Sequence, residues 1–213
     1  MTNSNHVTDI VSTEERLREI LGFPGEGAVA KELRSLDRHA RYFIERSPFA
    51  LLSSASRDGR CDVSPKGDVA GFVKVLDDRT LLIPDRPGNR RGDTFSNLLE
   101  NPHLGIIFLV PDVEETLRVN GRAVLSTDGD LLSMGEVNGK LPKLAIVVET
   151  EEVYFHCAKA FKRSGLWKPD TWLGRGELPT LGQIMVDQIR FEREISGESL
   201  NNEIEEAYVT NLY

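Results

Sequence analysis

Short apolar segments separated by turn residues run through the middle of the chain, and they constrain its fold more than any other feature. They occupy residues 49–55, 61–64, 72–76, 80–83, 103–110, 116–126 and 144–155. Arg57-Asp58-Gly59-Arg60, between the first two, has the composition of a hairpin turn. Many short strands with few helices favour a closed antiparallel barrel. The predicted fold class is therefore mainly β, with flanking helices.

Helices are expected on both sides of this β region. Ser12 and Glu15 have the spacing of a capping box, and Ser47-Pro48 has the form of a helix stop. The predicted helices are residues 12–21, 28–46, 94–100 and 128–134, one from Thr180, and a final acidic one. The resulting domain prediction is a helical segment over 1–46, a barrel over 47–175 and C-terminal helices over 176–213.

The composition narrows the class of protein. The formal net charge is −8, which argues against nucleic acid as the main partner because duplex binding relies on clustered Lys and Arg. Cys61 and Cys157 are the two cysteines, so we expect no disulfide framework, and the four histidines are too scattered to predict a metal site. Residues 1–9 are polar, and no apolar run approaches the ~20 residues of a spanning helix. We therefore expect a cytoplasmic protein that does not engage a membrane.

The turn over residues 85–93, which we call the arginine turn, is the strongest candidate binding site. It follows an apolar strand, precedes a predicted helix, and carries Arg86, Asn89, Arg90 and Arg91 around Pro and Gly. Guanidinium groups and free N–H groups at the start of a helix are what a phosphate requires. The alternative is that these arginines are solvated charges on a surface turn. Because the chain as a whole is acidic, we favour the anchor of a phosphorylated cofactor.

Ser64 and Lys66 form a second candidate pair within the polar segment 62–68. They are expected across the barrel from the arginine turn, where Lys66 would add a point charge and Ser64 a hydroxyl. The alternative is a polar loop closed by Pro and Gly.

Two further segments carry polar side chains at regular spacing. Arg118 and Asn120 alternate with apolar residues and so share one strand face, although any half-exposed strand shows this pattern. Lys159 and Arg163 are four residues apart on a predicted helix. Trp167 follows, and it could stack on a planar ligand or fill the edge of the core.

Taken in order, these segments resemble the FMN-binding split-barrel flavoproteins related to pyridoxamine 5′-phosphate oxidase. The resemblance covers roughly residues 40–175 and is carried by residues 62–68, 83–91, 97, 101–102, 115–123 and 159–167. It implies a six-stranded antiparallel split barrel that forms a homodimer, with FMN bound at the interface.

The resemblance also implies roles for residues of the first two segments. Arg90 and Arg91 resemble the pair that holds the FMN phosphate, with Asn89 nearby. Ser64 and Lys66 resemble the segment that lies along the isoalloxazine ring and reaches the phosphate.

Later residues are carried over in the same way. Thr116 stands where the oxidases have a glutamine that faces the flavin, and Trp167 resembles a tryptophan supplied by the partner subunit. Lys159 and Arg163 are assigned to the same cofactor site. The tail, residues 197–213, departs from the oxidases because it is acidic and has no Arg, His or Lys to hold a substrate phosphate. Oxidation of pyridoxamine phosphate is therefore not expected.

The function that the resemblance implies is an FMN-dependent oxidoreductase of unknown substrate. The flavin would carry the hydride chemistry, and a nicotinamide cofactor or a small organic molecule would supply the electrons. No residue is an evident general acid or base. The alternatives are a flavin carrier or sensor without turnover, a deazaflavin-dependent reductase, and a barrel whose cofactor site has lapsed.

Overall fold

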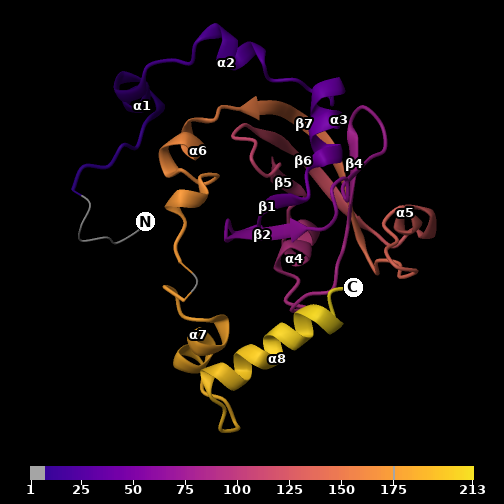
Figure 1. The fold of residues 1–213 in the computed structure, drawn as a ribbon. Helices are drawn as coiled ribbons and strands as arrows, with labels where there is room; N and C mark the ends of the chain where they lie inside the picture. The colour runs from indigo at the N-terminus through magenta and orange to yellow at the C-terminus, as the bar shows by residue number, and fades with distance from the viewer. Residues whose placement is uncertain (1–7, 175) are drawn as a thin grey trace. The chain divides into compact units, whose positions relative to one another are not determined.

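The apolar segments form one antiparallel sheet in the computed structural model, which describes residues 8–174 and 176–213 (Figure 1). The strands are β1 (Phe49–Ala55), β2 (Cys61–Gly67), β3 (Lys74–Val75), β4 (Thr80–Pro84), β5 (His103–Leu109), β6 (Thr116–Ser126) and β7 (Ala145–His156). Their order is β2-β1-β5-β6-β7-β4-β3. The mainly β prediction is confirmed. The sheet has seven strands rather than six because the two-residue β3 pairs with β4.

The sheet closes on itself near its two ends. Asp68 directly follows β2, Arg86 follows β4, and Arg86 Nε lies 2.5 Å from Asp68 Oδ2. β2 is the first strand in the order, and β4 is next to β3, the last one. This contact therefore joins the two sides of a barrel. Leu52, Ile106, Phe108 and Leu117 are fully buried in its interior. Each such side chain stabilises the fold by about 1.5–3 kcal/mol relative to an exposed one.

β2 runs further than the sequence indicates. The expected return strand ends at Ser64, whereas β2 continues through Pro65 to Gly67. Proline is tolerated there because β2 is the edge strand, so the missing N–H removes no bond to an inner neighbour. The segment expected as a possible polar loop is therefore mostly strand, and it presents its side chains at fixed register.

The helix predicted over residues 28–46 is two helices, α2 (Glu26–Ala30) and α3 (Arg38–Arg46). Between them Leu33 exchanges backbone hydrogen bonds with Val153, at 2.9 and 2.8 Å. Asp37 then caps α3 by accepting a hydrogen bond from the backbone N–H of Ala40. Strand-like pairing with β7 thus overrides the helical spacing of the sequence.

The remaining helices are α1 (Glu14–Leu21), α4 (Asp93–Glu100), α5 (Gly129–Ser133), α6 (Lys159–Ser164), the 3₁₀ turn η1 (Pro169–Thr171), α7 (Leu181–Gln188) and α8 (Gly197–Thr210). The cap of α1 is Thr13, whose side chain accepts from the Arg16 N–H, and not Ser12. No helix in the described part of the chain is long and apolar enough to cross a membrane.

The chain divides into two compact units, one up to Glu32 and one from Leu33 to Tyr213. The first contains α1 and α2. α3 belongs to the second unit, and its Ala40 and Ile44 are buried in the barrel core. The polar residues 1–7 and residue 175, the expected end of the barrel, lie outside the described residues.

Gly121 is required where β6 and β7 change register. A Cβ atom there would lie 2.1 Å from the carbonyl oxygen of Glu149, which is backbone and cannot swing away. We expect Gly121→Ala to destabilise the protein by about 1–3 kcal/mol, as overpacking does. Gly129→Ala is the matched control because a Cβ there meets nothing within 4 Å. Equal denaturant midpoints for the two variants would contradict this account.

Candidate cofactor site

The turn before α4 has a backbone shaped to hold an anion. Arg90 and Gly92 have φ values of 61° and 69°, whereas Arg91 between them is not in the positive-φ region. No side chain caps the first turn of α4. The free N–H groups at the start of α4 therefore lie directly after the two arginines.

Arg90 and Arg91 both reach solvent from this turn. Arg90 is exposed and has no ion-pair partner among the described residues. Arg91 Nε donates to Asp93 Oδ2 at 2.7 Å, and its side chain is 72% exposed. This hydrogen bond, together with the charges of Asp93 and Asp62, raises the pKa of Arg91 further. Asn89 braces the turn by accepting from the Arg91 N–H at 3.0 Å.

Arg86, the third arginine of the turn, does not belong to this group. Its side chain is largely buried, it pairs with Asp68, and it donates to the carbonyl oxygen of Gly135 at 2.8 Å. The expected cluster of three arginines is therefore corrected to two exposed arginines and one that holds the barrel together.

β2 brings Ser64 and Lys66 to the same region. They pair with Leu52 and Ala50 of β1 and so share the sheet face on which those two residues are buried. Lys66 Nζ is 5.4 Å from the ring centroid of Phe95, in the first turn of α4. Ser64 and Lys66 were expected across the barrel from the arginine turn, and the structure places Lys66 beside the first turn of α4, which directly follows that turn.

The first residue of the arginine turn, Asp85, carries a half-buried carboxyl group. Burial raises the pKa of Asp85, and the nearby charge of Lys66 partly offsets that rise. Lys66 is near the end of β2 and Asp85 is at the start of the turn. Because the charge of one affects the other, these two segments lie close together. The region therefore combines exposed cationic side chains with a half-buried acid.

α4 is fastened to the barrel by three polar side chains on one face. Thr94 Oγ1 donates to Asp62 Oδ2 at 2.8 Å, Asn97 Nδ2 to Ser54 Oγ at 3.0 Å, and Asn101 Nδ2 to the Ala55 carbonyl at 3.1 Å. Sequence analysis did not identify Thr94 and Asp62. The spacing of Thr94, Asn97 and Asn101 along one helix face is the signal that could have found them.

The other candidate residues form a second group at the junction of β6, β7 and α6. Thr116 is buried and pairs with His156 at the end of β7. Trp167 Nε1 donates to the Val113 carbonyl at 3.0 Å, and its ring stacks on Phe161. The contacts that Trp167 makes within the chain are therefore those of a residue at the edge of the core.

Lys159 and Arg163 lie on α6 and are both exposed. Neither has an ion-pair partner in the described part of the chain.

Arg118 and Asn120 share the outer face of β6, as expected. There Arg118 lies 5.1 Å from the Tyr154 ring centroid and Asn120 donates to Glu152 at 2.7 Å.

Lys66 and Thr116 point to opposite faces of the sheet. Lys66, Ala50, Phe108 and Leu117 form one row across four strands, and its buried members face the interior. Thr116 precedes Leu117, so strand alternation places it on the outer face. Three strand spacings of ~4.8 Å also separate β2 from β6. One copy of the chain therefore does not bring Thr116 to the Lys66 side.

The sequence of residues 36–157, more than half of the chain, matches the family described as pyridoxamine 5′-phosphate oxidase. The chain belongs to this family. No curated protein sequence matches it.

The chain is also similar to solved structures, including the three that follow. Each of these has a low sequence identity to this chain. A Lactobacillus delbrueckii protein described as a pyridoxamine 5′-phosphate oxidase is 21% identical, with 58% of this chain and 98% of that chain covered and a TM-score of 0.47. An FMN-binding protein from Syntrophomonas wolfei is 14% identical, with 67% and 96% covered and a TM-score of 0.42. HutZ, a heme storage protein from Vibrio cholerae, is 16% identical, with 57% and 93% covered and a TM-score of 0.42. These likenesses are too weak to assign a cofactor.

The donor set of this family member fits a phosphate group. Arg90, Arg91 and Lys66 supply three cations, and the uncapped start of α4 supplies N–H groups. Asp93 is the acid that a bound phosphate would displace from Arg91. A group with a phosphate tail is therefore compatible with this turn.

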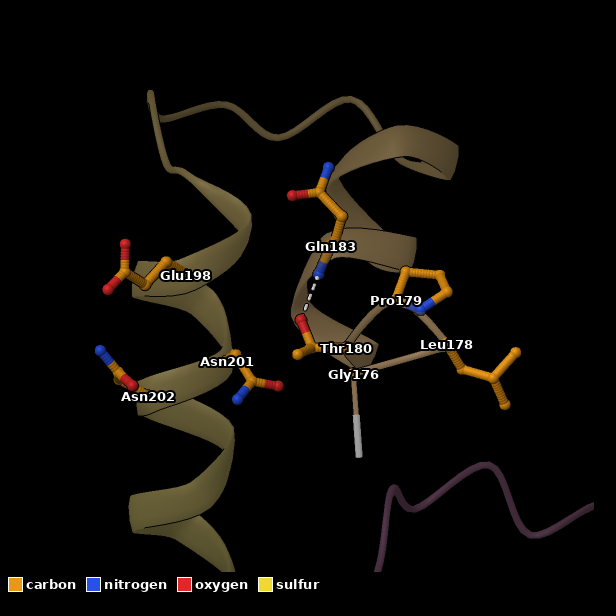
Figure 2. Close-up of a pocket in the computed structure, with 8 residues that line it drawn as sticks. All are labelled: Gly176, Leu178, Pro179, Thr180, Gln183, Glu198, Asn201 and Asn202. Carbon is orange, nitrogen blue, oxygen red and sulfur yellow. Dashed lines mark hydrogen bonds between the residues drawn. The ribbon is translucent and has the colours of Figure 1, made fainter. Parts of the chain in front are cut away.

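The hollow between α7 and α8 is a separate feature. Its volume is about 380 Å³, and Figure 2 shows polar side chains such as Gln183 and Asn201 along its walls. None of the candidate residues lines it. The two helices cross closely because Gly182 lies against Gly197, where a Cβ on Gly182 would be 2.4 Å from the Gly197 carbonyl oxygen. The hollow thus reflects helix packing and not the arginine turn.

Proposed function

We propose that the protein binds FMN through the Arg90–Arg91 turn and acts as an FMN-dependent oxidoreductase. The observation that carries the proposal is the meeting of two exposed arginines, Lys66 and the uncapped start of α4 in one region. Charge-assisted hydrogen bonds from guanidinium groups are among the strongest that a protein can offer a phosphate.

Each residue has a distinct task in this site. Arg90 and Arg91 hold the phosphate, and Asn89 keeps the turn in the conformation that presents them. Ser64 offers a hydroxyl from the same β2 face as Lys66. Lys66 is a fixed positive charge that favours a more negative, reduced form of the bound group and so raises its reduction potential. FMN, when bound, supplies the hydride chemistry, and the protein supplies binding and orientation.

A homodimer is part of the proposal, because Thr116 faces away from Lys66 within one copy of the chain. The outer face of β1, β2 and β5 is apolar and exposed at Phe49, Val63 and Ile107, with Leu51 and Pro65 between them. Apolar patches of this kind mark protein interfaces. We propose that a second copy covers this face, so that Thr116, Trp167, Lys159 and Arg163 of one copy complete the site of the other.

A charge in the centre of this face should prevent dimerisation. We expect Val63→Asp to give a monomer at micromolar concentration in sedimentation equilibrium, because two buried like charges would face each other. Val124→Asp is the control, since Val124 is equally exposed (64% against 61%) but lies where β6 pairs with β7. A wild-type protein that is itself monomeric would remove the dimer from the proposal.

The function is tested by the ligand and by turnover. The purified protein should show flavin absorbance, take up added FMN, release FMN identified by mass, and be reduced by NADH or NADPH. Bound FMN that neither donor reduces would favour a carrier or sensor. A deazaflavin mass would redirect the proposal to that cofactor, and a protein that takes up neither would overturn it.

Asp93 should weaken phosphate binding because its carboxylate already accepts a hydrogen bond from the Arg91 guanidinium. We expect Asp93→Asn to bind FMN about 2–5-fold more tightly, because an exposed ion pair is weak. The matched control is Asp58→Asn, which breaks the exposed Asp58–Arg60 pair in the β1–β2 turn. Weaker binding by Asp93→Asn in a calorimetric titration would show that Asp93 helps to orient Arg91.

A further inference from the structure

Tyr213 joins the tail to the base of the arginine turn. Its hydroxyl donates to Asp68 Oδ1 at 2.7 Å, while Arg86 Nε donates to Asp68 Oδ2 at 2.5 Å. Each oxygen of one carboxylate is thus held by a different segment, one from the tail and one from the turn. Figure 1 shows α8 leading into this end of the chain.

Two further contacts fix the position of Tyr213. Lys140 Nζ donates to its backbone carbonyl oxygen at 2.7 Å, and the Arg86 guanidinium lies 6.0 Å from its ring centroid. Arg86 also donates to the Gly135 carbonyl. Segments that follow β2, β4 and α5 therefore all meet at Tyr213.

The environment of Asp68 makes these contacts important. Its side chain is 1% exposed, and the Val69 N–H also donates to Oδ1 at 2.7 Å. Loss of the Tyr213 hydroxyl would therefore leave this buried oxygen with one donor instead of two. Burial by itself opposes ionisation, but the hydrogen bonds from Tyr213 and Arg86 outweigh it and hold the pKa of Asp68 below its usual range. The same hydrogen bond to Asp68 raises the pKa of Tyr213.

We propose that Tyr213 is a positioning residue for the arginine turn. It holds Asp68 in place, Asp68 fixes Arg86, and Arg86 anchors the turn four residues before Arg90. The inference rests on the proposed function, because it assigns the tail to the same phosphate site. Linkage then requires that FMN binding and docking of the tail strengthen each other.

The test compares Tyr213→Phe with the wild-type protein. The variant keeps the ring but loses the hydroxyl, so the amide hydrogens of residues 86–93 should exchange faster while those of β6 stay unchanged. FMN affinity should fall about 3–10-fold. This is less than the roughly 10–100-fold expected when a hydrogen bond to a charged group is lost directly, because Tyr213 acts on the turn through Asp68 and Arg86. Tyr208→Phe is the matched control, because Tyr208 is an exposed tyrosine of α8 without a hydrogen bond in the described structure.

A pH profile separates positioning from a general loss of packing. Asp68 faces the Arg86 guanidinium and the Tyr213 phenol, and Lys140 faces the Tyr213 carbonyl. In the wild-type protein the pKa of Asp68 is low, so protection of residues 86–93 should persist until the pH falls through that low value. In Tyr213→Phe the pKa of Asp68 should rise, and protection should be lost at higher pH.

A double variant completes the test. If Tyr213 acts through Asp68, adding Asp68→Asn to Tyr213→Phe should change exchange of the turn less than the sum of the single changes. Unchanged exchange in Tyr213→Phe, or additive effects, would overturn the inference. If the protein binds no FMN, the proposed function fails, but the exchange data still decide whether Tyr213 positions the turn.

Discussion

Replacing Arg90 and Arg91 together with alanine should reduce FMN affinity by about 10²–10⁴-fold, because two hydrogen bonds to a charged group contribute roughly 1.5–3 kcal/mol each. Both side chains are exposed on a turn outside the core, so the variant should fold. Titration of the apoprotein with FMN, followed by flavin fluorescence, measures the change. Unchanged affinity would place the phosphate anchor elsewhere.

Two controls make this result specific. Arg57→Ala with Arg60→Ala removes two exposed arginines from the turn at the other end of β2 and should leave FMN affinity unchanged. Arg90→Gly should weaken binding but stabilise the fold by up to about 1 kcal/mol, because glycine relaxes the left-handed backbone at φ 61°. Asp112→Gly, at φ 65°, should stabilise equally without affecting FMN.

The barrel could be predicted because its strands carry a local signal. Phe49–Ala55 and Thr116–Ser126 have the predicted bounds, since apolar alternation and flanking turn residues are both present in the sequence. The break after Ala30 could not be predicted, because it depends on pairing between Leu33 and Val153, 120 residues apart. A helical pattern in sequence gives no indication of such a distant partner.

The arginine turn shows the same limit at the level of the site. The sequence does not distinguish Arg86 from Arg90 and Arg91. In the structure, however, the Arg86 side chain is largely buried because it pairs with Asp68 and donates to the Gly135 carbonyl. Ser64 and Lys66 were expected across the barrel from the turn, because the sequence does not show that Lys66 lies 5.4 Å from the Phe95 ring in α4. The tail contact of Tyr213 had no signal in the sequence, since it joins residues 145 positions apart.

Arg86→Met should destabilise the protein by about 3–5 kcal/mol, since removing one partner of a buried ion pair leaves an uncompensated charge. Asp68 and Arg86 are 1% and 18% exposed, so solvent does little to weaken the pair. For a chain of this size the melting temperature should fall by roughly 10 °C. Arg193→Met is the matched control, because its pair with Glu203 is exposed to solvent and should contribute little to stability.

The pH dependence of this loss follows from Asp68. In the wild-type protein its pKa is lowered, so its contribution is present at neutral pH and is lost as the pH falls through the folded value. Without Arg86, burial should raise that pKa, and the penalty of the charged carboxylate disappears once acid protonates it. The stability gap between Arg86→Met and the wild-type protein should therefore be widest near neutral pH and narrow in acid. A gap that stays constant from neutral to acidic pH in chemical denaturation would show that Arg86 stabilises the barrel by packing, and that its charge contributes little.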